Sequence, residues 1–408
     1  MESSDRRASI VGGGQGGGMG SMSHGAPWRV PRMGSVSLKP VELGGGKAGA
    51  APRIAAMPAR QHIRFCTAAD GTRIAVASIG SGPPLLRAAH WLSHVDHDLD
   101  SPVWRPWLAE LSRQHTYIRY DQRGCGLSDP DVTEYSLDAW VGDLEAVVDH
   151  LGLQRFPLIG MSQGGAVAVA YAARHPERVS QLVLIGAYAL GVLRREPSEA
   201  QRLEAATMVN LIRIGWGSDN DAFRQLFTSL FIPDGTPEQH QWWTELERLT
   251  SSAENAARML ETFYQVDVSE RARQLDVPTL VLHPHGDARV PYEEGRRLAA
   301  LIPGARFVTL DSRNHVLLAG EPAFDALLSE LHAFLAPASA AWQSLGLTGT
   351  ERAVLELLAQ GLDNHRIAQQ LGKSEKTVRN QVSAIFAKLG VHTRAEAIVR
   401  ARESGGAG

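Results

Sequence analysis

The sequence of this 408-residue chain predicts an α/β fold, a doubly wound and mostly parallel sheet with a helical lid, followed by a small all-α domain. Short apolar runs typical of buried strands alternate with helix-length segments over residues 61 to 335. An aromatic-rich helical stretch interrupts that alternation between two of the runs. From residue 346 onward, apolar residues recur with helical spacing only.

Composition and charge are those of an ordinary globular protein. Hydrophobic residues make up 44% of the chain and the net charge is −3, which argues against a whole-chain binder of polyanions. No apolar run approaches the roughly 18 residues of a membrane span, and no signal-peptide core follows the N-terminal arginines. The two cysteines, Cys66 and Cys125, form no CxxC pair, which excludes a disulfide framework. We expect a cytoplasmic protein without membrane association.

Residues 1–58 are dominated by Gly, Ser, Pro and Ala, including the run GGGQGGGMG. No apolar period survives there, so burial cannot offset the entropy lost on ordering, and we expect this segment to be disordered. A natural start at Met57 is a further expectation, because the ordered pattern opens abruptly after it. The intact mass of the protein from its native host tests this, and a mass matching the full chain contradicts it.

Apolar runs in the next segment, residues 59–335, have the length of buried strands. The runs expected to be strands are 116–120, 156–159, 182–185, 279–282 and 306–310. Helix-length segments such as 163–174 and 293–301 fall between them. The strands are therefore expected to be parallel, with helices on both faces of the sheet.

The interval from about residue 187 to 274 is mostly helical and is interpreted as a lid over a pocket. Its aromatic residues are Trp216, Phe223, Phe227, Phe231, Trp242, Trp243, Phe263 and Tyr264. Packing of the insertion against the sheet explains most of them, so we expect only a few to line a cavity.

The segment Gly160-Met161-Ser162-Gln163-Gly164 matches the pattern G-x-S-x-G, between an apolar strand and a helix. A strand that turns sharply into a helix strains the serine backbone and crowds its neighbours, so the flanking positions must lack bulk. The turn presents the serine hydroxyl at a helix N-terminus. There the backbone amide of Gln163 can face a developing oxyanion.

A serine nucleophile needs a base, and the base needs an acid that orients it. Asp287 lies in the loop after the strand TLVLH, and His315 lies in the loop after the strand RFVTL. Because each residue follows a separate strand, the pattern predicts a catalytic triad of Ser162, Asp287 and His315. The alternative is that Asp287 is a turn residue and His315 a satisfied surface histidine.

This order of nucleophile, acid and base resembles the α/β-hydrolase superfamily, and the resemblance covers residues 61–335. The segment YDQRGCGLSD, residues 120–129, is similar to a D-x-R-G-x-G-x-S loop common in that family. We interpret this loop as structural, with Arg123 and Asp121 paired locally and Cys125 as a small filler rather than a nucleophile. The resemblance implies a serine hydrolase acting on esters, lactones or similar acyl compounds. We expect no cofactor.

One departure from the family concerns the second oxyanion donor. The family usually carries His-Gly and a bulky residue after the third strand, where this chain has Ala89-His90 before Trp91. The resemblance then assigns the oxyanion hole to the backbone amides of Gln163 and Trp91. Because His90 replaces a glycine, we expect it to restrict that backbone, and a lost donor costs about 3 kcal/mol of transition-state stabilisation.

The same loop, HWLSHVDHDLD, gathers side chains that are able to bind a metal ion. They are His90, His94, Asp96, His97 and Asp98. No H-E-x-x-H spacing exists, and loop histidines near the mouth of an active site are commoner than metal ligands. We therefore expect no metal site.

Residues 336–345, APASAAWQSL, are expected to link the body to a basic module. Between residues 346 and 403, nine Lys/Arg stand against six Asp/Glu, although the whole chain is acidic. A basic module on an acidic body indicates nucleic-acid binding at one end only.

Helix signals divide the module into four short helices. Thr348 with Glu351 forms a capping box that starts the first helix, and Gly361 ends it. Thr393 with Glu396 starts the last helix in the same way. In the third helix, apolar residues recur at i, i+4, i+7 and i+11 and must face the core. These residues are Val378, Val382, Ile385 and Leu389.

The module resembles the LuxR-type helix-turn-helix domain over its whole length, on the segments LTGTERAVLELLAQG, NHRIAQQL, SEKTVRNQV and IFAKLG. The resemblance implies binding to double-stranded DNA through the polar side of the third helix. Arg379, Asn380 and Ser383 are expected at base edges, and Lys376, Thr377 and Lys388 on phosphates. The alternative is a solvated charged face on a helical bundle.

Family members usually bind DNA as dimers through the last helix, here about residues 394–402. Ala397, Ile398 and Ala401 are expected to form the dimer patch.

The sequence thus suggests a transcriptional regulator whose hydrolase body binds and hydrolyses a small acyl compound. One alternative is a ligand sensor that uses the hydrolase pocket without turnover. Another alternative is an ordinary hydrolase whose C-terminal tail only tethers it to DNA. Binding of a substrate analogue changes operator affinity under the first two hypotheses and leaves it unchanged under the third.

Overall fold

The computed structural model describes residues 60–217, 221–336 and 346–403. The segment 1–58, the start at Met57 and nearly all of the linker 336–345 lie outside these ranges. No helix within the described ranges is long and apolar enough to cross a membrane.

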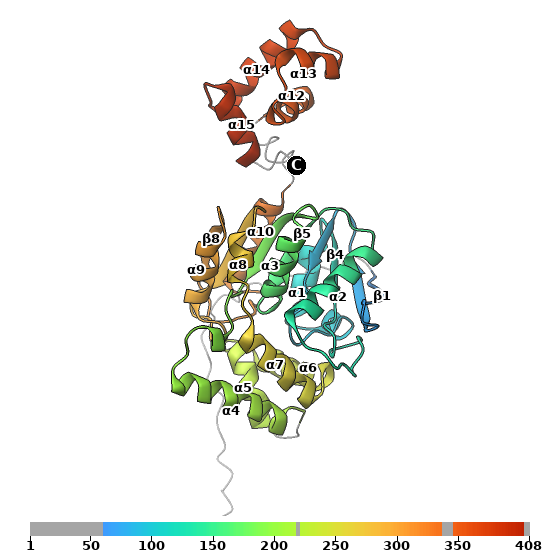
Figure 1. Cartoon of the computed structure of the whole chain (residues 1–408), viewed down its shortest axis with the longest axis vertical. Coiled ribbons are helices and arrows are strands. Elements are labelled where there is room, and N and C mark those ends of the chain that lie inside the picture. Colours follow the sequence, from blue (N-terminus) through green and yellow to red (C-terminus); the bar gives the residue numbers. More distant parts are fainter. Residues whose placement is uncertain (1–59, 218–220, 337–345, 404–408) are drawn as a thin grey trace, which may run out of the picture. The chain divides into compact units, whose positions relative to one another are not determined.

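A sheet of eight strands forms the centre of the body (Figure 1). The strand order in this sheet is β1-β2-β4-β3-β5-β6-β7-β8. Strand β2 runs antiparallel to both of its neighbours, and all other pairs are parallel. The strands are β1 (His62–Thr67), β2 (Arg73–Ile79), β3 (Pro84–Arg87), β4 (Thr116–Tyr120), β5 (Phe156–Met161), β6 (Val179–Ile185), β7 (Thr279–Pro284) and β8 (Arg306–Leu310). All five strands expected from the sequence are present.

Helices cover both faces of the sheet, as the alternation of apolar segments predicted. They are α1 (Trp104–Leu111), α2 (Leu137–His150), α3 (Gly164–Arg174), α8 (Ser269–Arg273), α9 (Tyr292–Leu301) and α10 (Pro322–Leu335). Helices α2, α3, α8 and α9 pack against one another in series. Helix α1 meets α10 through the rings of Trp107 and Phe324, whose centroids are 5.2 Å apart. Two short 3-10 helices, η1 (His97–Asp100) and η2 (Val192–Arg194), lie in loops.

The strand order reverses direction beside β3, which has β4 on one side and β5 on the other. In open parallel sheets, ligands bind at the carboxyl ends of the strands where the order reverses. The loops that follow β3 and β5 therefore meet at one point, and they carry Trp91 and Ser162 respectively.

Four helices between β6 and α8 make up the lid (Figure 1). They are α4 (Glu199–Gly215), α5 (Asp221–Phe231), α6 (Pro237–Thr250) and α7 (Ala253–Gln265). Side-chain caps define the starts of three of them, because Ser198, Thr236 and Ser252 each accept a hydrogen bond from the third backbone amide of the helix. The interval predicted to be helical thus consists of separate helices, three of which begin at a side-chain cap.

The final helices are α12 (Gly349–Ala359), α13 (Asn364–Leu371), α14 (Glu375–Leu389) and α15 (Arg394–Glu403), and they enclose a hydrophobic core of their own. The capping box of Thr348 and Glu351 is formed as predicted, and Gly361 has a φ of +83°. At α15 the amide of Glu396 donates to Thr393, but its carboxylate accepts from His392. The four predicted core residues of α14 are all buried.

The expected pairing of Arg123 with Asp121 is wrong. Arg123 makes a bidentate pair with Asp143, with N–O distances of 2.8 and 2.7 Å, and reaches Asp70 at 2.7 Å. The carboxylate of Asp121 instead accepts the backbone amides of Val95 and Leu127. The loop is structural, as interpreted, but its arginine is held by helix α2 rather than by its own loop.

Candidate active site and DNA-binding surface

Ser162 occupies the turn between β5 and α3, where its φ of +53° places a non-glycine residue in left-handed backbone. This conformation costs free energy and persists where the surroundings enforce it. Two close approaches enforce it here. A Cβ atom on Gly160 would lie 2.7 Å from the Cα of Gly165, and one on Gly164 would lie 2.6 Å from the carbonyl oxygen of Ala89. The flanking glycines are therefore required by space, as the motif predicts.

Asp287 and His315 are brought together from the loops after β7 and β8. The Nδ1 atom of His315 lies 2.7 Å from Oδ2 of Asp287. The other carboxylate oxygen accepts the backbone amides of Arg289 and Val290 at 2.8 and 2.9 Å. Burial raises the pKa of Asp287, but the charge and hydrogen bond of His315 outweigh it, so the pKa lies below its ordinary value. The carboxylate is thus ionised and oriented toward the imidazole.

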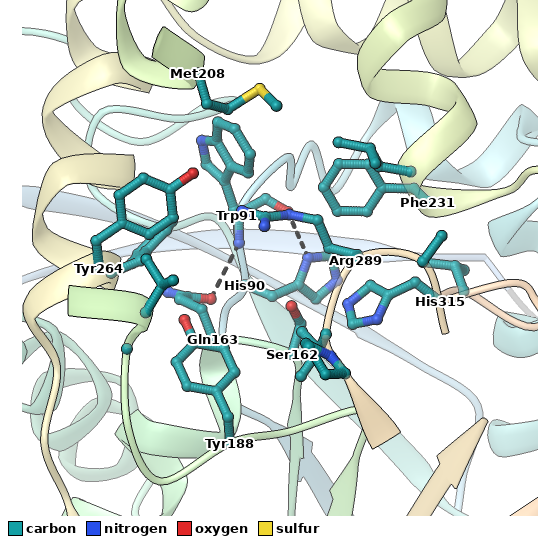
Figure 2. A pocket seen from close by; sticks show the side chains of 18 of the residues that line it. His90, Trp91, Ser162, Gln163, Tyr188, Met208, Phe231, Tyr264, Arg289 and His315 are labelled. Carbon is teal, nitrogen blue, oxygen red and sulfur yellow. Dashed lines mark hydrogen bonds between the residues drawn. The ribbon is translucent and has the colours of Figure 1, made fainter. Parts of the chain in front are cut away.

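Ser162 and His315 line one cavity of about 290 Å³, beside each other in Figure 2. The Nε2 atom of His315 is buried and has no hydrogen-bond partner among the described residues, including Ser162. Catalytic hydrogen bonds are often long in unliganded enzymes and tighten on substrate binding. The structure therefore places the three predicted triad residues around one site, with only the acid–base pair bonded.

Aromatic side chains form part of the cavity wall. Of the lid aromatics expected from the sequence, Phe231, Trp243, Phe263 and Tyr264 line it, together with Trp91 and Trp104 from the body. The ring of Phe231 lies 5.7 Å from that of His315. As expected, only some lid aromatics reach the cavity. The apolar part of this cavity, which lies beside a serine, suits a small ligand with a hydrocarbon part.

The second predicted oxyanion donor is occupied by a side chain of the protein. The amide of Trp91 donates to Oε1 of Gln163 at 3.2 Å (Figure 2). The Nε2 atom of the same carboxamide donates to Oε1 of Gln122 at 3.0 Å. The two predicted donors, the amides of Gln163 and Trp91, lie at the site. An oxyanion can reach the Trp91 amide only when the carboxamide of Gln163 leaves it.

The backbone at His90 does not have the positive φ that favours glycine. Among the described non-glycine residues only Leu92, Ser162 and Glu196 have positive φ, so the position of His90 does not demand glycine. Its Nδ1 atom lies 2.6 Å from the carbonyl oxygen of Trp91. Burial, reinforced by the charge of Arg87, lowers the pKa of His90 well below its ordinary value. The imidazole is thus neutral, donates from Nδ1, and carries its lone pair on Nε2 at the cavity wall.

Three other side chains of the histidine-rich loop, those of His94, His97 and Asp98, contact neighbouring protein groups. His94 Nδ1 accepts the amide of His97, and the ring of His97 stacks on Trp242 at 4.9 Å. Asp98 lies 3.8 Å from Arg119 in a fully buried ion pair. In the part of the chain that is described, no three ligand-type side chains converge as a metal site requires.

Sequence reasoning missed a contact of the Asp287 loop and the contacts between the His315 loop and the lid. His283 is buried, and its Nε2 atom faces the carbonyl oxygen of Val290 at 3.0 Å and Asp287 at 3.6 Å. No spacing in the sequence indicates this contact.

Both neighbours of His315 bind the lid, one at the last residue of α5 and the other in the loop that follows this helix. Oδ1 of Asn314 accepts the amide of Asp234 at 3.0 Å, and the amide of Val316 donates to the carbonyl of Phe231 at 3.1 Å. Asn314, which had no role in the sequence analysis, thus joins the proposed base to the lid.

In the C-terminal domain, the predicted DNA-contacting side chains are exposed on α14. They are Lys376, Thr377, Arg379, Asn380, Ser383 and Lys388. Arg379 lies 3.3 Å from Glu375 in the first turn, and Ser383 donates to the carbonyl of Arg379. These contacts are local, on the exposed side of the helix.

Two expectations about this domain need correction. The Nζ atom of Lys388 lies 2.7 Å from Glu351 and 2.9 Å from the carbonyl oxygen of Gly346, so it holds the start of α12 rather than projecting toward phosphate. Ala397 and Ala401 are buried in the domain core and cannot form a dimer patch. Among the residues of α15 whose burial is described, Val399 is the exposed large hydrophobic side chain, at 53%.

Comparisons with known proteins agree with this architecture. Residues 96–231 match the alpha/beta hydrolase fold family, and residues 252–337 match a family described as TAP-like protein. Over 260 residues the chain is 29% identical to a non-heme haloperoxidase of Rhodococcus erythropolis, covering 62% of this chain and 92% of the relative. It is also 29% identical to a 2-hydroxy-6-oxo-2,4-heptadienoate hydrolase of Pseudomonas putida, covering 49% and 71%.

Solved structures give the same result. An esterase of Exiguobacterium antarcticum has a TM-score of 0.57 at 25% identity, covering 65% of this chain and 97% of the esterase. An esterase of Rhodococcus sp. has a TM-score of 0.54 at 27% identity, covering 67% and 98%. The body of this chain has the α/β-hydrolase fold.

The C-terminal helices match bacterial regulatory proteins of the luxR family over residues 345–401. The protein therefore joins an α/β-hydrolase domain to a LuxR-type DNA-binding domain.

Proposed function

We propose that this protein is a transcriptional regulator whose hydrolase domain binds and cleaves a small acyl compound of the ester or lactone type. The observation that carries the catalytic part is the 2.7 Å contact of His315 with an ionised, buried Asp287 at the cavity lined by Ser162. The division into a hydrolase domain, residues 59–335, a linker, 336–345, and a DNA-binding domain, 346–403, belongs to the same proposal.

In the proposed reaction Oγ of Ser162 attacks the acyl carbonyl carbon while its proton passes to Nε2 of His315. Asp287 stabilises the resulting imidazolium through Nδ1. The oxyanion is held by the amides of Gln163 and Trp91, after the Gln163 side chain has left Trp91. Collapse expels the alcohol, which takes the proton from His315, and water then releases the acyl group from Ser162 by the same route. No cofactor is needed for this chemistry.

Reaction with a fluorophosphonate probe tests the activated serine. The wild type should be labelled, and the labelling should be lost in both Ser162→Ala and His315→Ala. A folded wild type that is not labelled contradicts the catalytic proposal.

A ligand sensor without turnover is the second candidate function. The observation that favours it is the 3.2 Å bond from the Trp91 amide to Gln163, which leaves one oxyanion donor engaged in the unliganded protein. Screening esters and lactones for turnover separates the two candidates.

Regulation is proposed to act on DNA binding through Lys376, Thr377, Arg379, Asn380 and Ser383, while Lys388 is withdrawn from this set. Arg and Asn match the hydrogen-bonding edges of guanine and adenine in the major groove. A dimer through α15 remains part of the proposal, with Val399 in place of the buried alanines. Operator affinity measured with and without the phosphonylated serine tests the coupling, and an unchanged affinity favours simple tethering.

A further inference from the structure

Arg289 lines the cavity two residues after Asp287, and its position is fixed by the proposed catalytic acid itself. Oδ1 of Asp287 accepts the backbone amide of Arg289 at 2.8 Å, while Oδ2 of the same carboxylate contacts His315. The guanidinium carbon lies 5.8 Å from the centroid of Phe231, the ring that also faces His315. Arg289 and His315 both line the cavity near Phe231 (Figure 2), and the carboxylate of Asp287 contacts both residues.

The guanidinium of Arg289 has no ionic partner in the described ranges, whereas the second arginine of the cavity does. Arg195 lies 3.2 Å from the buried carboxylate of Glu294, which Arg297 shares at 3.6 Å. Burial lowers the pKa of Arg195, Glu294 opposes this, and the charges of Arg297 and Arg289 add to the lowering. Positive charge at this wall therefore exceeds the negative charge that faces it.

Two tyrosines complete the same wall. Burial raises the pKa of Tyr188 to about 12, against the opposing charges of Arg289 and Arg195. Burial also raises the pKa of Tyr264, and Arg289 opposes that rise by its charge and by contact with the hydroxyl. Both phenols remain protonated and able to donate hydrogen bonds beside the free guanidinium.

Glu204 of α4 also lines the cavity. Its carboxylate raises the pKa of Tyr264, whereas Arg289 lowers it. Glu204 is exposed, however, so solvent screens its charge, and it forms no ion pair with Arg289 in the part of the chain described. The buried side of the wall keeps its excess positive charge.

We propose that the compound taken by this cavity carries a carboxylate in addition to its scissile acyl group, and that Arg289 binds this carboxylate with help from Tyr188 and Tyr264. The planar fork of an arginine matches a carboxylate in bidentate geometry. A single negative charge matches the single unpaired guanidinium, and the aromatic walls accommodate a hydrocarbon chain between the carboxylate and the ester. This inference names the substrate class of the proposed hydrolase and rests on that proposal.

Pairs of p-nitrophenyl esters test it. Mono-esters of adipate, pimelate and suberate carry a terminal carboxylate, and each is compared with the ester in which a terminal isopropyl group replaces that carboxylate. The wild type should favour the anionic member of at least one pair by about tenfold or more in kcat/KM, which is the scale of a charge-assisted hydrogen bond.

The variant Arg289→Gln should lower kcat/KM for the anionic ester by about 10- to 100-fold and change the neutral ester by about twofold at most. Arg194→Gln is the matched control, because Arg194 is exposed and lies outside the cavity lining, so removing its charge should change neither ester. Glu204→Gln should raise the preference for the anionic ester. Melting temperatures verify that each variant is folded.

Hydrolysis of every pair without preference for the carboxylate, or an equal loss on both esters in Arg289→Gln, overturns the inference and leaves the proposed function standing. If no ester is hydrolysed, the proposed function fails, and the inference is decided by calorimetric binding. Monomethyl adipate should then bind the wild type more tightly than methyl 6-methylheptanoate, and Arg289→Gln should abolish the difference. Equal binding in that case overturns both proposals.

Discussion

Replacing Gln163 by methionine is expected to raise the hydrolytic rate of this protein. The carboxamide of Gln163 occupies the Trp91 amide at 3.2 Å and is anchored at its other end by Gln122. Methionine has a similar length and volume but accepts no comparable hydrogen bond. The backbone amide of residue 163, the other oxyanion donor, is retained.

The magnitude follows from the bonds exchanged. In the wild type an oxyanion must displace one neutral hydrogen bond before it reaches Trp91, and such a bond contributes about 0.5–1.5 kcal/mol. Relieving that requirement should raise kcat/KM by about two- to tenfold, at roughly 1.4 kcal/mol for each factor of ten. The gain cannot approach the roughly 3 kcal/mol of a whole oxyanion donor, because the donor is present in both proteins.

Initial rates with p-nitrophenyl butyrate measure this change, alongside the melting temperature. Gln122→Met is the matched variant, because it loosens the far end of the carboxamide without removing it, and it should give a smaller increase. A loss of tenfold or more in Gln163→Met, with the melting temperature unchanged, refutes the reasoning. That result would mean that the carboxamide positions the Trp91 amide for catalysis.

Three further predictions concern other contacts. Asp287→Asn should lower kcat by about 10³- to 10⁴-fold, because the imidazole loses the partner that sets its tautomer, and single-turnover kinetics with the folded variant check this. In the C-terminal domain, Lys388 lowers the pKa of Glu351 from its ordinary 4.5 to about 2, aided by the amide at the helix start. A carboxyl with a depressed pKa stabilises the fold above its unfolded pKa, so protection of the α12 amides from hydrogen exchange should fall as pH drops from 4.5 toward 2. In Glu351→Gln that pH dependence should be absent. Arg379→Ala should weaken specific DNA binding by about 1–3 kcal/mol and relax base preference, whereas Lys376→Ala should mainly reduce the salt dependence of binding, as fluorescence anisotropy at several salt concentrations would reveal.

Much of the sheet and the three candidate triad residues could be predicted from the sequence. Parallel strands place their carboxyl ends at one edge, so residues that follow β5, β7 and β8 converge even though they lie far apart in the chain. The alternation of apolar segments predicts these parallel strands, and so it also predicts that Ser162, Asp287 and His315 lie close together.

Contacts that depend on side-chain direction could not be predicted in this way. Arg123 was assigned to its neighbour in sequence, but the structure gives it Asp143, which only the packing of α2 brings near. The sequence shows the spacing of the alanines of α15, which suggests a surface stripe. It does not show the domain core into which these alanines pack. The hydrogen bond from the Trp91 amide to Gln163 likewise depends on the rotamer of Gln163, and no periodic pattern in the sequence predicts that rotamer.

Two hydrogen bonds join the His315 loop to the end of α5 and to the loop that follows it, so in the proposed reaction access to the cavity and reactivity depend on each other. Residues 314 and 316, on either side of His315, hold Asp234 and Phe231 at 3.0 and 3.1 Å. An outward swing of α5 must break these bonds or carry the imidazole away from Asp287. While the cavity is open, the proposed base is then not positioned for catalysis. Ser162 could attack a bound compound only after α5 has returned to its closed position. Under the proposed function, capture and cleavage would thus be successive events, with an intact ligand held in the interval between them.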